Sequence, residues 1–229
     1  MDPLTLRQVA ALTGGRRVGG DDGVVIRRIE TDSRKVRAGD LFVCLSGDRF
    51  DGHGFAAEAI ARGATAALVN RDVGNLSPVV RVADTLKALG ALGNAVRRAS
   101  RAAANPLVVA ITGTNGKTGT KNLTAAALGV ERVTVASKRS YNNAIGVPLT
   151  LLDIDGTSEA AVVEVGTNAP GEISQLTRLV EPDVGVILNI GAGHLAGLCS
   201  VDAVCYEKYS LTEGLGRPKV SVLNRDDAM

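Results

Sequence analysis

Short apolar runs rich in β-branched residues alternate with amphipathic stretches along the second part of the chain. Strands that alternate with helices form parallel sheets with helices on both faces. This part therefore predicts a mostly parallel, doubly wound α/β domain. One helix is expected to continue through Leu128 and another to cover residues 201–215. The predicted strands are residues 107–111, 132–136, 161–165, 184–190 and 219–223.

The first part of the chain has a less regular pattern and predicts a small α/β domain of its own. A helix at 6–12 is expected, because Thr5 and Gln8 have the spacing of a capping box. A long helix at 85–103 leads to Pro106, and we place the domain boundary in or just before it, giving domains 1–83 and 84–229. Another helix is predicted at 55–62, and strands at 24–29, 40–45, 66–69 and 79–82.

Charge and composition exclude several classes of protein. The formal net charge is only +2, and 45% of the 229 residues are hydrophobic, which supports a globular fold of one or two domains. Three nearby arginines, Arg97, Arg98 and Arg101, fit a solvated helix face better than a nucleic-acid-binding stripe. We therefore expect no nucleic-acid partner.

Membrane-spanning segments and disulfide bonds are also not expected. No apolar run approaches the ~18 residues of a membrane span, and the N-terminal residues lack the form of a signal peptide, so we expect a cytoplasmic protein without a membrane span. The cysteines form no CxxC pair and lie in apolar stretches, which favours buried, reduced thiols. They are Cys44, Cys199 and Cys205.

A glycine-rich loop, TGTNGKTGTK at residues 112–121, lies between a predicted strand and a predicted helix. This arrangement points backbone N–H groups and a helix N-terminus at a phosphate, so we predict a nucleoside triphosphate site. Lys117 would reach the outer phosphates and Thr118 would face a magnesium ion. The first glycine comes late for a general P-loop pattern, and an ordinary turn is the alternative. The predicted cofactor-binding residues are Gly113, Thr114, Asn115, Gly116, Lys117 and Thr118.

Polar residues follow two further strands of the same predicted sheet. Glu164 ends the third strand, and Asn189 and His194 follow the fourth. Ligands of parallel sheets bind at the carboxyl ends of the strands, so these residues are expected to meet the glycine loop at one edge. Glu164 could instead end its strand in solvent or cap the next helix, and a lone histidine is usually structural.

Five segments in one order give a more specific indication. They are residues 31–43, 112–118, 141–152, 164–173 and 189–197. Together they resemble the Mur ligase family, the ATP-dependent amide-forming enzymes of peptidoglycan precursor synthesis. Within that family they are most similar to the type that adds D-alanyl-D-alanine.

The resemblance implies ATP and Mg²⁺ as cofactors. Lys117 and the loop amides would hold the β- and γ-phosphates, and Thr118 with Glu164 would bind a first magnesium ion. His194 and Lys208 would contribute to a second metal site, with Lys208 carbamylated. Lys117, His194 and Lys208 are then the catalytic candidates. Without the resemblance, Lys208 would be interpreted as a solvated helix lysine.

The resemblance also implies the substrates, UDP-MurNAc-tripeptide and D-alanyl-D-alanine, joined through an acyl phosphate. Asn142 and Asn143 would position the carboxylate substrate, and Ser33 and Arg34 would hold its UDP end. His53 lies in a segment similar to one that closes over that end. The alternative for all of these is a role in turns or helix caps.

The sequence departs from the family at three positions and in its extent. Gly119 replaces a hydroxyl residue, Ser210 an acidic residue, and Ala169 a bulkier polar one. By comparison with the family, we expect the sequence to lack the remainder of the central domain and the C-terminal amine-binding domain. Turnover is expected to need that part, which a complementing C-terminal chain could supply. The alternatives are a non-catalytic nucleotide- or UDP-sugar-binding module, and a Mur-like ligase with another acyl substrate.

Overall fold

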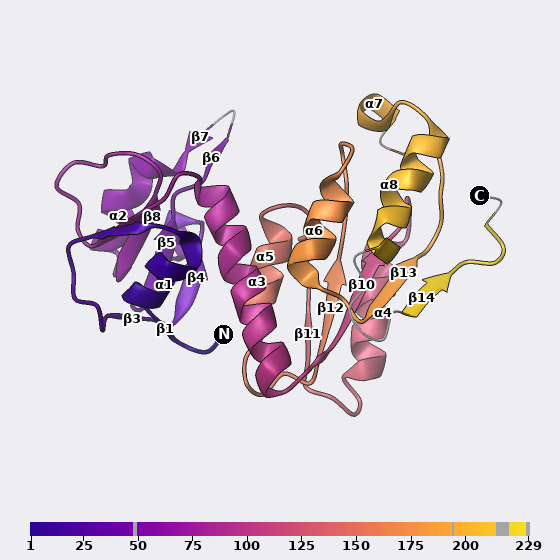
Figure 1. The fold of residues 1–229 in the computed structure, drawn as a ribbon, viewed down its shortest axis with the longest axis horizontal. Helices are drawn as coiled ribbons and strands as arrows, with labels where there is room; N and C mark the ends of the chain where they lie inside the picture. The colour runs from indigo at the N-terminus through magenta and orange to yellow at the C-terminus, as the bar shows by residue number, and fades with distance from the viewer. Residues whose placement is uncertain (48–49, 194, 214–219, 228–229) are drawn as a thin grey trace. The chain divides into compact units, whose positions relative to one another are not determined.

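The computed structural model describes residues 1–47, 50–193, 195–213 and 220–227. The chain forms two compact units, residues 1–95 and 96–229. The division falls inside the long helix α3 (Thr85–Ala103), whose bounds are those predicted from the sequence (Figure 1).

The first unit is built on a five-stranded sheet in the order β2-β9-β8-β5-β4. Its pairs are parallel except for β2 with β9, which is antiparallel. Strands β5 and β8 are buried along their whole length, which places them at the centre of the core. The elements are β1 (Leu4–Thr5), α1 (Leu6–Thr13), β2 (Arg16–Val18), β3 (Val25–Ile26), β4 (Arg28–Glu30), η1 (Ser33–Lys35), β5 (Asp40–Val43), β6 (Ser46–Gly47), β7 (Phe50–Asp51), η2 (Gly52–Phe55), α2 (Ala56–Ala61), β8 (Ala66–Val69) and β9 (Val79–Arg81).

Local signals explain the start of this unit. The capping box is confirmed: the backbone N–H of Gln8 donates to Thr5 Oγ1 at 3.2 Å, and that of Thr5 donates to Gln8 Oε1 at 2.7 Å. The single strand predicted at 24–29 is wrong, because the chain changes sheets there. Strand β3 pairs with β1, whereas β4 pairs with β5, so the run is divided at Arg27.

The second unit contains a parallel five-stranded sheet in the order β11-β12-β10-β13-β14, which confirms the predicted fold class. Its central strand β10 is the one that precedes the glycine loop. The elements are β10 (Leu107–Thr112), α4 (Lys117–Leu128), β11 (Thr134–Ala136), α5 (Gly146–Leu152), β12 (Ala160–Glu164), α6 (Glu172–Val180), β13 (Val184–Ile187), α7 (Leu195–Leu198), α8 (Val201–Glu213) and β14 (Val220–Leu223).

Helices lie on both faces of this sheet (Figure 1). Helix α4 packs on one face, where its Ala125 and Leu128 contact the cluster formed by Val109, Ile111 and Val162. Helices α5, α6 and α8 pack on the other face against β12, β10 and β13. Both faces of the central strand are thus removed from water, as expected for a nearly continuous apolar strand.

The arginine cluster is not the solvated face predicted from the sequence. The side chain of Arg97 is 0% exposed, and it donates to Val180 O at 3.0 Å and to Asp183 Oδ2 at 3.2 Å. Arg101 donates to the other carboxylate oxygen of Asp183 at 3.0 Å, and only Arg98 remains largely exposed. The prediction was wrong for Arg97, because spacing along a helix does not show that a carboxylate from another segment meets it.

The prediction for the cysteines is correct for one of the three. All three are free thiols, but only Cys44 is buried, and burial raises its pKa to about 12. Cys205 is partly exposed and Cys199 is exposed. Cys199 lies in the turn between α7 and α8 with a φ of +65°.

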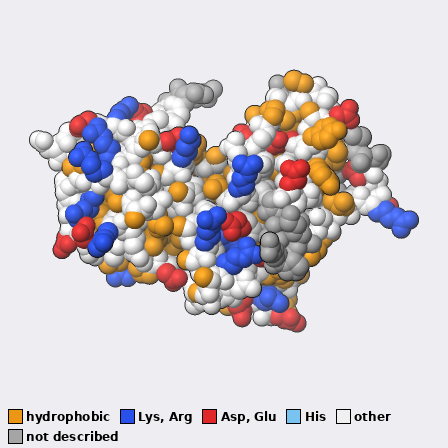
Figure 2. All heavy atoms as spheres, viewed as in Figure 1, with side chains coloured by type: hydrophobic (Ala, Val, Ile, Leu, Met, Phe, Trp, Pro, Cys, Tyr) orange, Lys and Arg blue, Asp and Glu red, His pale blue; other side chains and the backbone are white. Residues whose placement is uncertain are grey.

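Helix α8 has one face against the sheet and one toward solvent. Lys208 and Leu211 are buried, whereas Tyr206 and Tyr209 are 79% and 54% exposed, and apolar surface gathers over this helix in Figure 2. None of the described helices combines the length and the hydropathy that a membrane crossing requires.

Candidate phosphate and metal site

The glycine loop joins the end of β10 to the start of α4. Gly116, the residue before the helix, has a φ of +82°, a conformation that favours glycine. At Gly113 a Cβ would lie 2.9 Å from the Cβ of Leu188, so that position has no room for a side chain. The loop conformation therefore requires both glycines.

The loop is held by the segment that follows β13. The backbone N–H of Asn115 donates to Asn189 Oδ1 at 2.9 Å, and Asn189 Nδ2 donates back to Asn115 O at 3.1 Å. Thr114 Oγ1 accepts from the backbone N–H of Gly191 at 3.0 Å. A segment far away in sequence therefore fixes the loop, which favours a ready-made cradle over an ordinary turn.

The start of α4 provides positive potential. The backbone N–H groups of a first helical turn have no partners within the helix, and no side chain caps Gly116. Lys117 bends back over the loop, where its Nζ donates to Gly113 O at 2.8 Å and Thr114 O at 3.1 Å. Burial lowers the pKa of Lys117, and the charge of Glu164 opposes that shift. An anion at this helix start would be stabilised by the dipole and by Lys117.

Glu164 lies beside the start of this helix, at the end of β12. Its side chain is almost fully buried, and both carboxylate oxygens are occupied. Oε2 accepts from Thr118 Oγ1 at 2.9 Å, and Oε1 accepts from Asn142 Nδ2 at 2.8 Å. A Cβ on Gly166 would lie 2.8 Å from the side chain of Asn142, so the small residue leaves room for this contact.

This pair of oxygens suits magnesium. Mg²⁺ is usually bound by one or two protein oxygens together with phosphate and water, and Thr118 with Glu164 provides such a pair next to the phosphate cradle. Within the described residues, no cluster of three or more His, Cys, Asp and Glu side chains could hold a metal ion without such added ligands.

The two asparagines differ in their contacts. Asn142 holds Glu164, as described above. Asn143 Oδ1 accepts from the backbone N–H groups of Ile145 at 3.1 Å and Gly146 at 2.9 Å, so it caps the start of α5. Only the NH₂ group of Asn143 is then available to donate to a substrate carboxylate.

Lys208 lies on the inner face of α8 and is 1% exposed. Burial, and after it the nearby positive charge of Lys117, together lower its pKa to about 8, against the opposing charge of Glu207. The two lysines are therefore close enough to interact electrostatically. His194, the other residue predicted for this region, lies outside the described residues.

Glu207, the neighbour of Lys208 on α8, was not recognised from the sequence. Its carboxylate accepts from the backbone N–H groups of Gly171 at 2.6 Å and Ile173 at 2.7 Å, and from Thr167 Oγ1 at 3.3 Å. Gly171 directly precedes α6, and Ile173 lies in the first turn of that helix. A helix glutamate is usually solvated, so only the tertiary contact identifies this role.

The predicted UDP-binding residues belong to the first unit. Ser33 and Arg34 form the 3₁₀ turn that begins after Asp32. Arg34 donates to both carboxylate oxygens of Asp32, at 2.8 and 2.9 Å, which raises the pKa of Arg34 and lowers that of Asp32. Ser33 is buried, whereas the side chain of Arg34 is 80% exposed.

His53 in the same unit has a structural environment. Its Nδ1 lies 2.6 Å from Asp51 Oδ1, and its Nε2 accepts from the backbone N–H of Asn70 at 3.2 Å. Asp51 also pairs with Arg71. Both ring nitrogens are therefore engaged, which leaves His53 no donor or acceptor for a ligand in this arrangement.

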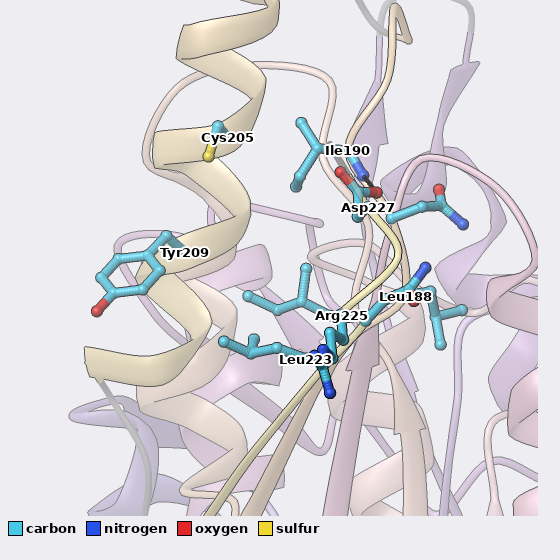
Figure 3. Close-up of a pocket in the computed structure, with 10 residues that line it drawn as sticks. Leu188, Ile190, Cys205, Tyr209, Leu223, Arg225 and Asp227 are labelled. Carbon is cyan, nitrogen blue, oxygen red and sulfur yellow. Dashed lines mark hydrogen bonds between the residues drawn. The ribbon is translucent and has the colours of Figure 1, made fainter. Parts of the chain in front are cut away.

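An apolar pocket of about 380 Å³ lies at the carboxyl ends of β13 and β14 (Figure 3). Cys205 and Tyr209 of α8 line one side, and the segment that follows β14 lines the other. Asp227 joins this segment to the residues that follow β13, because its carboxylate accepts from the backbone N–H of Ile190 at 2.8 Å. Asn189, which holds the glycine loop, also lines the pocket, so the two sites are adjacent.

The parallel sheet, the glycine loop and the carboxylate at the next strand end define a P-loop α/β protein. Two family profiles match: "Mur ligase middle domain" over residues 111–229 and "Mur ligase family, catalytic domain" over residues 25–113. The chain belongs to the Mur ligase family.

Relatives in the same family are similar over the whole chain. The UDP-N-acetylmuramoyl-tripeptide–D-alanyl-D-alanine ligase of Escherichia coli is 38% identical over 99% of this chain and 49% of its own length. That of Bacillus subtilis is 36% identical over 98% and 49%. The chain therefore spans about half the length of the curated relatives it matches.

Solved structures agree with this assignment. A crystal structure of MurF from Acinetobacter baumannii has a TM-score of 0.91 and 34% identity, covering 100% of this chain and 50% of that one. A MurF ligase structure from Thermotoga maritima in complex with ADP has a TM-score of 0.78 and 31% identity, covering 87% and 46%.

Proposed function

We propose that the chain forms the substrate- and ATP-binding part of a ligase that joins D-alanyl-D-alanine to UDP-MurNAc-tripeptide in the cytoplasm. Residues 1–83 would bind the UDP end of the substrate, and residues 84–229 would bind ATP. The observation that carries the proposal is the contact of Thr118 Oγ1 with Glu164 at 2.9 Å, at an uncapped helix start beside Lys117.

The ligand chemistry follows from this arrangement. Lys117 and the loop N–H groups would hold the β- and γ-phosphates, while Thr118 and Glu164 would hold Mg²⁺. Bound magnesium neutralises the charge of the phosphates during phosphoryl transfer. The adjacent pocket, next to Asn189, would take the base of the nucleotide, because its exposed lining is mostly apolar, with Ile187, Leu188, Ile190 and Leu223 among its residues.

The reaction has two balanced steps. An oxygen of the substrate carboxylate attacks the γ-phosphorus, the bond to the β-phosphate oxygen breaks, and ADP leaves. The amine nitrogen of the dipeptide then attacks the acyl carbon, phosphate leaves, and the amine loses a proton. Asn143 would orient the carboxylate through its NH₂ group, while Asn142 would hold Glu164.

Lys208 and His194 would contribute to a second metal site. Carbamylation converts the lysine amine into an oxygen ligand and requires the neutral amine. The lowered pKa of Lys208, about 8, supports this role. At the other end of the substrate, Ser33 and Arg34 would bind the UDP group, for which Arg34 would exchange Asp32 for a phosphate.

A non-catalytic nucleotide-binding module is the second candidate. It is favoured by Gly119, where a Cβ would meet nothing within 4 Å, so the fold does not require glycine there. It is also favoured by Ser210, which stands where the family has an acidic residue. The hydroxyl of Ser210 donates to Glu207 O at 2.6 Å.

Phosphate release separates the two functions. The chain is incubated with ATP, Mg²⁺ and UDP-MurNAc-tripeptide, with and without D-alanyl-D-alanine, and with and without the second half of the E. coli relative. Dipeptide-dependent release supports the ligase, and saturable ATP binding without release under all conditions supports the binding module.

The matched variants are Lys117→Ala in the loop and Lys138→Ala, an exposed lysine of the same unit. Loss of the contact to the outer phosphates should weaken ATP binding at least tenfold in Lys117→Ala, whereas Lys138→Ala should bind normally. Equal binding by both variants, measured by calorimetry, would contradict the proposed phosphate site.

A further inference from the structure

A second lysine of α4 is buried, and it has no carboxylate partner among the residues that the structure describes. Lys121 is 2% exposed, and its Nζ donates to Ser137 O at 2.7 Å and to Arg139 O at 2.9 Å. Removing an ammonium group from water costs free energy. Two neutral carbonyls offset this desolvation cost less well than a carboxylate does. Simple packing of α4 would be better served by an apolar residue, so the lysine requires another explanation.

The two carbonyls belong to the turn that leads from β11 to Asn142. Arg139 has a φ of +49°, which is unfavourable for a residue with a side chain, so the turn depends on contacts that hold it. Lys121 binds the carbonyl of this residue and the carbonyl two positions earlier. The lysine therefore holds the turn at its most strained position.

The same turn holds Glu164 both at its backbone and at its carboxylate. The hydroxyl of Ser137 accepts from the backbone N–H of Glu164 at 3.0 Å, and Asn142 donates to Glu164 Oε1 at 2.8 Å. Thr118, three residues before Lys121 on α4, binds the other oxygen of Glu164. Residues three apart share a helix face, so α4 reaches Glu164 directly through Thr118 and indirectly through Lys121.

We propose that Lys121 is a positioning residue, which holds the Ser137–Asn142 turn so that Glu164 stays opposite Thr118. The inference rests on the proposed function, in which this pair holds magnesium. Partners that orient a metal ligand commonly change metal affinity 10- to 100-fold when removed. Lys121 would act on the metal through Glu164 and would touch neither the nucleotide nor the ion.

Lys121→Met tests this role, because methionine fills a similar volume without the amine. The matched control is Lys138→Met, whose lysine lies in the same turn but is 68% exposed and pairs with Asp153. The first measurement is amide hydrogen exchange in the metal-free protein. Exchange at residues 137–143 and at the N–H of Glu164 should become at least tenfold faster in Lys121→Met and stay unchanged in Lys138→Met.

The second measurement is ATP affinity by calorimetry, in Mg²⁺ and in EDTA. In Lys121→Met the gain in affinity on adding Mg²⁺ should fall about tenfold, while the affinity in EDTA should stay within about twofold of the wild type. A purely structural role would weaken both affinities alike. If Lys121→Met does not fold, Ser137→Ala removes the hydroxyl that accepts from the N–H of Glu164 and from Thr150 Oγ1, and it should lower the magnesium-dependent gain in the same direction.

The outcomes separate the inference from the proposed function. Unchanged exchange in Lys121→Met, or a magnesium-dependent gain equal to that of Lys138→Met, would overturn the positioning role. If the wild type binds no ATP under any condition, the proposed function fails. The exchange measurement then still decides whether Lys121 holds the turn.

Discussion

At the scale of single residues, the buried amine of Lys208 gives a prediction for pH dependence. Burial and the charge of Lys117 lower its pKa from 10.5 to about 8, so the neutral, reactive form increases as pH rises through 8. An exposed lysine with a pKa near 10.4 has about two orders of magnitude less neutral amine at neutral pH. With ¹³C-bicarbonate, a carbamate signal at Lys208 should therefore grow between pH 6.5 and 8.

Carbon-13 NMR measures this signal, and Lys208→Ala provides the control because it removes only that amine. The exposed Lys87 should show no comparable carbamate over the same range. A signal that persists in Lys208→Ala would show that another lysine is modified.

The sequence predicts some residue contacts and misses others for a physical reason. Thr118 and Glu164 could be paired in advance, because parallel strands end at one edge of the sheet. Lys121, Ser137 and Glu207 could not, because a buried lysine or glutamate has the same local sequence signal as a solvated one. Their partners are backbone groups of other segments, and a backbone partner cannot be identified from the type of its side chain.

At the scale of elements, the carboxylate of Glu207 joins α8 to the first turn of α6. No side chain of α6 itself caps the start of that helix, and Gly171 precedes it with a φ of +84°. Glu207→Ala should remove charge-assisted hydrogen bonds to Gly171 and Ile173 and lower the free energy of unfolding by about 2–3 kcal/mol. Urea denaturation followed by circular dichroism measures the change.

A matched control is Glu213→Ala, because that glutamate is exposed on the same helix. Its effect should stay within about 0.5 kcal/mol. Glu207→Gln retains an acceptor without the charge and should fall between the two. A loss for Glu207→Ala no larger than for Glu213→Ala would show that α6 is stabilised by other contacts.

The elements themselves were more predictable than their ends. The sequence predicts α3 and β8 with their observed bounds, because their apolar patterns are clear. Strand β13 ends at Ile187 instead of residue 190, since Asn189 turns away to hold the glycine loop and Ile190 binds Asp227. The apolar run thus continues beyond the end of the strand, and tertiary contacts determine where the strand ends.

At the scale of the whole molecule, one face of the parallel sheet is only partly covered. On the side of α4, Val184 and Val186 are partly buried, and their neighbours Val220 and Val222 on β14 are 42% and 49% exposed. Among the described elements, α4 packs mainly over β10, β11 and β12. Doubly wound sheets normally carry helices on both faces. We call these four residues, Val184, Val186, Val220 and Val222, the valine strip, and we expect it to bind further polypeptide.

We expect the occupant of this valine strip to come from the half of the relatives' length that the chain does not span. The chain should bind the second half of the E. coli relative, as measured by calorimetry and analytical ultracentrifugation. Val222→Asp places a charge in the strip and should weaken binding at least tenfold, because the carboxylate must be desolvated. Val130→Asp, at a position 82% exposed outside the strip, should bind normally. Self-association of the wild type that Val222→Asp abolishes would instead identify a second copy as the occupant.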